Sequence, residues 1–150
     1  MTTKSRASVR IVVCLFLLGV SLASMPRAAA ACRPPDSTGS AVLDEWGNRF
    51  TSLGASVPET AFRTQIRITI AQLAMFDAVN AVLDGPYRPF ASKPPSPCGA
   101  SPDAAAIRAA YIVARNEFPT KTGTIDTAYS AAIAGVDASP AGIADGIVVG

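Results

Sequence analysis

The feature that most constrains the fold is the stretch of residues 58–83, from Pro58 to Leu83, which contains no glycine and no proline after its first residue. Its length suits a helix of about seven turns. Ser56 can cap the start, Pro58 suits a first turn in which its missing N–H is no loss, and Glu59 complements the N-terminal dipole. Gly85-Pro86 then ends the helix. This segment predicts a long helix.

The apolar pattern of this helix predicts where it lies. One stripe at helical spacing contains large apolar side chains, namely Phe62, Ile66, Leu73, Phe76 and Leu83. After Ile70 the polar side of the helix almost vanishes. A helix that is apolar nearly all round is normally surrounded by other helices. We therefore expect an all-α bundle with residues 58–83 at its centre and Phe76 in its core.

Two polar residues interrupt this apolar run, Asp77 and Asn80. An unpaired buried polar group costs about 1–3 kcal/mol, so both residues need partners. With Asp84 they share one helix face, which would suit either an oxygen-ligand or catalytic site or a set of hydrogen bonds to neighbouring loops. Cation sites need more oxygen ligands than these. We expect Asp77 and Asn80 to be structural polar residues, and no metal, cofactor or catalytic residue is assigned.

Further helices are predicted on either side of this segment. In residues 41–53 the side chains of Val42, Trp46, Phe50 and Leu53 recur at helical spacing. Ser101-Pro102-Asp103 is a helix start, and the pattern that follows reaches about Phe118. Residues 124–133 form a short helix, and Ser139-Pro140 starts another over residues 141–149. Gly142, Gly146 and Gly150 lie on one stripe of that helix, which allows close approach of a second helix.

The N-terminal segment, Met1–Ala31, is predicted to be a secretory signal peptide. Lys4, Arg6 and Arg10 precede an apolar run over residues 11–24, and small residues up to Ala31 suit cleavage. The run is too short for a typical membrane span, so no stable span is expected after processing. A lipoprotein anchor at Cys32 is less favoured, because position 29 is Ala. Residues 32–40 are a linker, and residues 41–150 form the folded domain.

Charge and cysteine content fit an exported protein. The chain has 13 Lys and Arg against 11 Asp and Glu, but four of the positive residues belong to the leader, so the mature chain is slightly acidic. No basic patch indicates a nucleic-acid partner. Removal of the leader leaves Cys32 and Cys98 as a candidate disulfide, because an even cysteine pair in an oxidising compartment usually pairs.

The residue types limit the chemistry. The chain has no histidine, which excludes a Ser-His-Asp triad and the usual zinc sites. Neither a phosphate-binding glycine loop nor a nucleophile elbow is present. Lys93 and Lys121 are expected to be solvated. Trp46, the single tryptophan, is expected to be a packing anchor. Asn48 and Arg49 beside it either line a site or face water.

The residues 70–80 (IAQLAMFDAVN), the following Tyr87-Arg88-Pro89-Phe90 and the SPDAA segment that starts at Ser101 together resemble a known family. They are similar to the N-terminal helical region of vanadium-dependent haloperoxidase-like proteins, in the type 2 phosphatidic acid phosphatase superfamily. That region also has a tryptophan on an early helix, as Trp46 is here. The resemblance spans residues 42–150. It implies an all-α fold, with vanadate or phosphate bound in the intact family.

The resemblance places the family's chemistry on segments that this sequence lacks. Those segments are Lys-x₆-Arg-Pro, Pro-Ser-Gly-His and Ser-Arg-x₅-His-x₃-Asp, and none occurs here. We expect the chain to be the N-terminal scaffold of an exported haloperoxidase- or phosphatase-like protein, interrupted at Gly150 and inactive by itself, with self-association through exposed apolar helix faces. One alternative is a small exported binding module, acting through the Gly142–Gly150 stripe. Another is an independent enzyme that uses Asp77.

Overall fold

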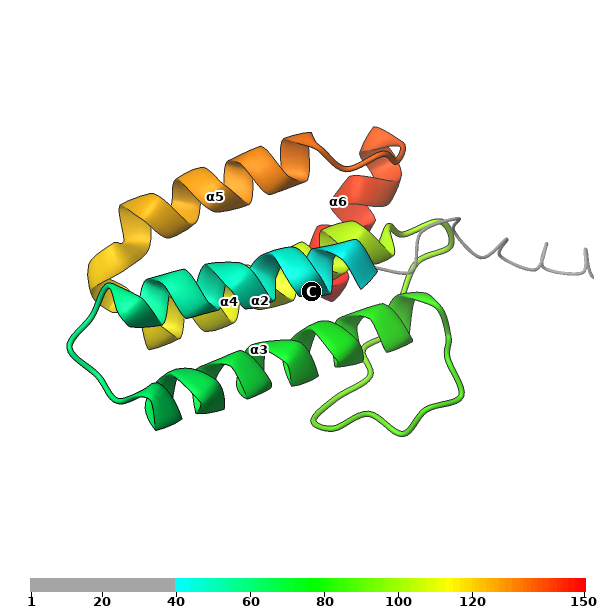
Figure 1. The fold of residues 1–150 in the computed structure, drawn as a ribbon. Coiled ribbons are helices and arrows are strands. Elements are labelled where there is room, and N and C mark those ends of the chain that lie inside the picture. Colours follow the sequence, from blue (N-terminus) through cyan, green and yellow to red (C-terminus); the bar gives the residue numbers. More distant parts are fainter. Residues whose placement is uncertain (1–39) are drawn as a thin grey trace, which may run out of the picture. The chain divides into compact units, whose positions relative to one another are not determined.

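The computed structural model describes residues 40–150, and this part of the chain is all-α, as predicted (Figure 1). Its helices are α2 (Ser40–Ala55), α3 (Ala61–Val82), α4 (Pro102–Glu117), α5 (Thr122–Ala134) and α6 (Pro140–Val149), with a short 3₁₀ turn, η1 (Pro119–Lys121), between α4 and α5. The predicted leader and the linker up to residue 39 lie outside the described residues. Ser40, which we assigned to the linker, begins α2.

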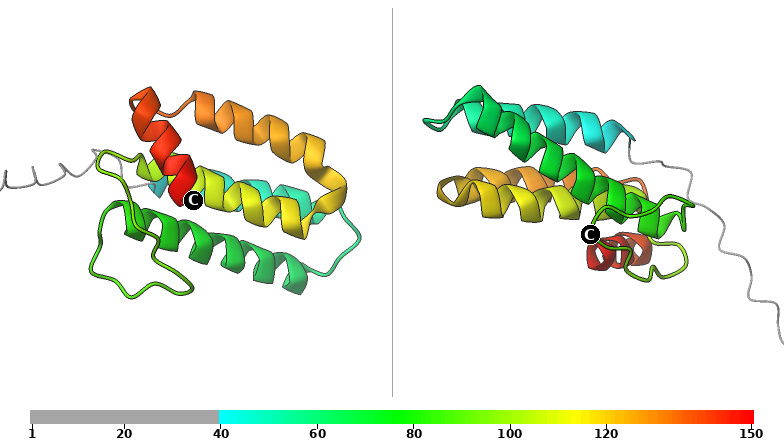
Figure 2. Two further views of the ribbon diagram at one scale, coloured as in Figure 1. Left: turned by 180° about the vertical axis from the view of Figure 1, so that it is seen from behind. Right: turned by 90° about the horizontal axis from the view of Figure 1, so that it is seen from below.

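The central helix of this bundle is α4. It packs against α2, α3, α5 and α6, and α3 and α5 lie on opposite sides of it in both the front and the back views (Figures 1 and 2). Its buried side chains are mostly alanines: Ala104, Ala105, Ala106, Ala109, Ala110 and Ala114, with Ile107. Alanine lets neighbouring helices approach closely on several sides. The prediction that residues 58–83 form the centre is therefore wrong.

Helix α3 is packed along one side only. Its buried positions include Ala71, Met75, Ala78 and Ala81, and these face the alanine-rich surface of α4. Of the predicted stripe of large side chains, Phe62, Ile66 and Phe76 are exposed, whereas Leu73 and Leu83 are half-buried. Phe62, Ile66, Ile70 and Phe76 are exposed, Phe62 by 74% and Phe76 by 39%; we call these four residues the α3 outer face. The expected core position of Phe76 is wrong, because the small side chains pack against α4 in its place.

The start of α3 also differs from the prediction. The helix begins at Ala61, and Thr60 is its cap, with the Thr60 hydroxyl accepting the Arg63 N–H at 3.3 Å. Ser56 is not the cap; it lies four residues before Thr60, and its hydroxyl donates to the Leu53 carbonyl near the end of α2. Glu59 accepts a hydrogen bond from the Thr64 hydroxyl at 2.8 Å. The residues between α2 and α3 are therefore a connecting turn.

Helix α2 buries the four residues that its spacing predicts, Val42, Trp46, Phe50 and Leu53. The Phe50 ring lies 6.5 Å from the Trp46 ring and 5.9 Å from the Phe118 ring, in an edge-on arrangement with the latter. Aromatic rings prefer such tilted and edge-to-face contacts. This row joins α2 to the end of α4.

Two predicted helix starts are confirmed. Ser101 caps α4 by accepting the Ala104 N–H at 3.2 Å, and Ser139 caps α6 by accepting the Gly142 N–H at 3.0 Å. The glycine stripe of α6 packs against the start of α4, within the same chain. A side chain at Gly146 would collide with the Ser101 carbonyl and the Ala104 methyl. The stripe is thus already occupied, which overturns its proposed use as a surface for another chain.

Candidate functional site

Asp77 lies near the end of α3, is 6% exposed, and binds the backbone of the loop that follows the helix. Its carboxylate accepts N–H groups from Phe90 at 2.7 Å, Ala91 at 2.7 Å and Ser92 at 3.1 Å. Burial by itself raises the pKa of Asp77, but these backbone donors together outweigh burial and leave the pKa below its usual value. The carboxylate is therefore charged and fully engaged at neutral pH.

Asn80, one turn further along α3, binds the same loop. Its amide nitrogen donates to the Tyr87 carbonyl at 2.9 Å, while its buried Oδ1 has no partner among the described residues. Asp84 does not join this pair, since it is exposed and forms an ion pair with Lys93 at 2.9 Å. No cluster of three or more potential metal-ligating side chains occurs in residues 40–150. Asp77 and Asn80 therefore anchor the loop that follows α3.

The loop itself exposes its aromatic residues. Tyr87 is 65% exposed and Phe90 is 73% exposed, although the Tyr87 ring lies 6.0 Å from the ring of Phe76. A hollow of about 450 Å³ lies beside Phe76 and is lined by Leu73, Phe76, Arg88, Pro89 and Phe90. The apolar surface of the α3 outer face therefore continues onto the loop.

Arg67 is engaged within the chain and is not free to bind an anion. Its guanidinium pairs with Glu59 and donates to Glu117 at 3.1 Å, and it lies 4.5 Å from the centre of the Phe118 ring. These contacts join the start of α3 to the end of α4. Arg63, the neighbouring cation on α3, is exposed. The two arginines do not form a joint anion site.

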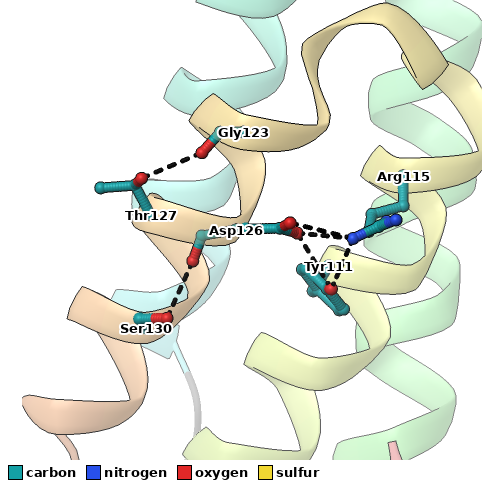
Figure 3. Close-up of polar contacts among 6 residues, drawn as sticks. All are labelled: Tyr111, Arg115, Gly123, Asp126, Thr127 and Ser130. Carbon is teal, nitrogen blue, oxygen red and sulfur yellow. Dashed lines mark hydrogen bonds and ion pairs between the residues drawn. The ribbon is translucent and has the colours of Figure 1, made fainter.

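Helices α4 and α5 are held together by one polar cluster (Figure 3). The Asp126 carboxylate accepts the Tyr111 hydroxyl at 3.0 Å and the Arg115 guanidinium at 2.8 Å. The Tyr111 hydroxyl, followed by Asp126, raises the pKa of Arg115. Tyr111 also stacks on Tyr129 with ring centres 4.2 Å apart, and Arg108 lies over both rings. These contacts keep α5 against α4.

Helix α5 borders a groove that it shares with α2. The groove has a volume of about 480 Å³ and apolar walls formed by Trp46, Leu53, Ile125 and Ala128. A second hollow of about 580 Å³ shares Arg49, Thr124 and Ala128 with it and continues along α5. Ligand sites in proteins commonly have volumes of this size and mainly apolar walls. We treat this groove, called the α2–α5 groove, as the candidate site.

Polar groups gather on the rim of the α2–α5 groove. Arg49 pairs with Glu45 one turn before it and lies 5.8 Å from the centre of the Trp46 ring. Ser52 and Ser56 donate to backbone carbonyls of α2. The remaining polar groups on the rim are Asn48, Lys121 and Thr124. The Trp46 Nε1–H is buried and has no hydrogen-bond partner within the described residues.

Sequence reasoning found parts of this site without joining them. Trp46 was identified as a packing anchor, which its 1% exposure confirms, but the unpaired N–H on its ring could not be foreseen. Asn48 is exposed and Arg49 is half-buried, and both lie on the rim of the groove. Lys121 belongs to η1 and reaches the same rim, which no motif indicates.

Two other predictions, the disulfide and the absence of a membrane span, involve residues both inside and outside the described part of the chain. Cys98 is part of the exposed loop before α4, but Cys32 precedes residue 40, so their pairing stays a prediction. Among the described residues no helix is long and apolar enough to cross a membrane.

Comparisons with protein-family models, with curated proteins and with solved structures gave no match to this chain.

Proposed function

We propose that the chain is the helical N-terminal support of an exported protein of the vanadium-dependent haloperoxidase and acid phosphatase type. The observation that supports this proposal is the apolar surface on both sides of α3. One side packs against α4 through small residues, and the other carries Phe62, Ile66, Ile70 and Phe76 toward solvent. Contiguous exposed apolar surface on a soluble protein usually marks a contact with another element or protein. In this proposal the part of the protein that carries the oxyanion site covers the α3 outer face.

The internal contacts of the chain suit a supporting role. Asp77 and Asn80 are used to hold the loop after α3, and Arg67 is used to join α3 to α4. Oxyanion chemistry needs several fixed cationic or N–H donors that converge on one small volume, together with a group that transfers protons. The Asp77 carboxylate and the Arg67 guanidinium are engaged within the chain in this way. We therefore propose that the chain binds no vanadate by itself and that catalytic groups come from elsewhere.

The coding sequence that follows Gly150 tests this proposal directly. The proposal expects Lys-x₆-Arg-Pro and Pro-Ser-Gly-His in the same reading frame, and bromide oxidation or phosphate-ester hydrolysis by the longer product. The chain of 150 residues, assayed beside it with vanadate, should turn over neither substrate. A stop codon directly after Gly150, or reproducible turnover by the short chain, would contradict the proposal.

Export and a disulfide between Cys32 and Cys98 are part of the same proposal. They are supported by the basic and apolar pattern of residues 1–31 and by the even cysteine pair that remains after cleavage near Ala31. Mass spectrometry of the exported protein under non-reducing conditions should find a new N-terminus close to Cys32 and the two cysteines joined. Lipid attachment to Cys32, or free thiols at both positions, would argue against it.

A second function, a small exported binding module, is favoured by a different observation. The α2–α5 groove combines apolar walls with polar groups on one rim and a buried N–H that has no partner among the described residues. Such a combination is the usual form of a small-molecule site. Saturable occupancy of the groove by a small molecule, detected through the fluorescence of Trp46, is the test of this function.

A further inference from the structure

We propose that the α2–α5 groove binds a small amphiphilic carboxylate, with the apolar part of the ligand between α2 and α5 and its carboxylate at the rim near Lys121. This inference rests on the second of the two proposed functions and is independent of the first. It specifies the class of ligand, which cannot be inferred from the fold or from the presence of a groove alone. Three properties of the lining residues carry it: the charge of the rim, the excess of donors, and the apolar walls.

The charged groups on the rim favour an anion. Arg49 and Glu45 form an ion pair, so their charges largely offset each other. Lys121 has no acidic partner among the described residues, and its side chain is half-buried at the rim. The lining therefore has one net positive charge that is not neutralised within this part of the protein. A single carboxylate is complementary to it, and a charge-assisted hydrogen bond to Lys121 would be the stronger kind.

The hydrogen-bonding groups of the lining favour an acceptor. The buried Trp46 Nε1–H can only donate, and it has no partner in residues 40–150. The nitrogen is covered by surrounding atoms of the chain, so the groups that a ligand meets first are those on the rim. The Thr124 hydroxyl and the Asn48 amide add further donors on the same rim. Both groups can donate to a carboxylate, and the positive charge of Lys121 favours a carboxylate over a neutral alcohol or a cationic amine.

The walls favour an apolar body of moderate size. Leu53, Ile125 and Ala128 face the groove from two helices, and its volume of about 480 Å³ exceeds what a carboxylate alone would fill. The neighbouring hollow along α5 leaves room for a longer chain. An alkyl or aryl group in this space would leave water at roughly 25 cal/mol per Å² of apolar surface. An inorganic anion would gain no such free energy, because it has no apolar surface to remove from water.

The fluorescence of Trp46 provides the measurement, because Trp46 is the only tryptophan in the sequence and lines the groove. The purified protein is titrated with sodium octanoate and, in parallel, with 1-octanol as a neutral molecule of equal chain length. We expect a saturable change in Trp46 emission with octanoate and a weaker response to octanol. Lys121→Gln should raise the dissociation constant for octanoate about fivefold, as the loss of one partly exposed ion pair predicts. It should leave the response to octanol unchanged.

Two further variants complete the experiment, each checked by circular dichroism for retained helix. Lys93→Gln removes the other lysine of the described chain, which pairs with Asp84 and does not line the groove, and should leave octanoate binding unchanged. Ala128→Phe fills the groove and should abolish the response to both probes. The absence of a saturable change in Trp46 emission overturns both the ligand class and the binding-module function. Equal binding of octanol and octanoate, blocked by Ala128→Phe, overturns the carboxylate alone and leaves the groove as an apolar site.

Discussion

At Asp77 a single carboxylate holds three consecutive backbone N–H groups of the loop after α3. The sequence could predict that Asp77 needs partners, because it lies in a nearly uninterrupted apolar run. It could not predict which groups these are, since they come from residues 13 to 15 positions further along an irregular loop. Asn80 binds the same loop through the Tyr87 carbonyl. The order of this loop thus depends on two side chains of one helix.

Replacement of Asp77 by Asn should destabilise the protein by about 1–3 kcal/mol, because the amide presents a donor to backbone N–H groups. The folded-state pKa of Asp77 is lower than its ordinary value of 3.8. Its contribution to stability is therefore complete above that value and is lost as the pH falls through the folded pKa. Urea unfolding between neutral and acidic pH should show less loss in Asp77→Asn than in the wild type. The exposed Asp137→Asn is the control, and an equal effect of both variants would contradict the assignment.

Adjacent residues of α3 should respond in opposite ways to truncation. Met75 is fully buried, so Met75→Ala should cost about 2–5 kcal/mol. Phe76 is 39% exposed and its ring lies 6.0 Å from the exposed Tyr87 ring, so Phe76→Ala should cost much less. Chemical unfolding of the two variants measures the difference. A larger loss for Phe76→Ala would mean that the face of α3 has been assigned the wrong way round.

At the scale of the helices, the local start signals of α4 and α6 were reliable, whereas the predicted start of α3 and its predicted buried face were not. Ser101 and Ser139 cap α4 and α6 as predicted, because a serine before a proline is a local signal that needs no tertiary information. The stripe of large side chains on α3 was also recognised, but it was assigned to the core. Hydrophobicity favours burial of Phe62 and Phe76, whereas the bundle buries alanines where α3 and α4 approach closely. Periodicity alone cannot choose between two apolar faces of one helix.

The close approach of α6 and α4 predicts opposite effects at two glycines. Gly146→Ala should destabilise the protein by about 1–3 kcal/mol, because the added methyl meets the Ser101 carbonyl and the Ala104 side chain. Gly47 lies within α2, and a methyl there would meet no atom within 4 Å. Gly47→Ala should therefore stabilise the protein by up to about 1 kcal/mol. Thermal unfolding of the two variants measures both effects. An unchanged melting temperature for Gly146→Ala would mean that α6 packs more loosely against α4 than described.

At the scale of the whole molecule, the described residues form a helical bundle with two surface features of different kinds. Between α2 and α5 it has a groove with polar groups on its rim, and along α3 it has an open apolar face. An all-α fold could be predicted from the sequence, because helix periods and caps recur along residues 41–149. The groove could not, because Trp46 and Lys121 are brought together only by the way α5 packs on α4 through Asp126.

The central claim is that the α3 outer face is a contact surface. Helix α3 is folded even when no other element or protein covers this face. Sedimentation velocity of the purified protein over a range of concentrations tests this claim most directly, beside the double variant Phe62→Ser/Ile66→Ser. We predict that the wild type self-associates as its concentration rises, because this face carries large exposed apolar side chains. The variant should remain monomeric with unchanged helix content. A wild type that stays monomeric throughout, or a variant that associates equally, would contradict the claim.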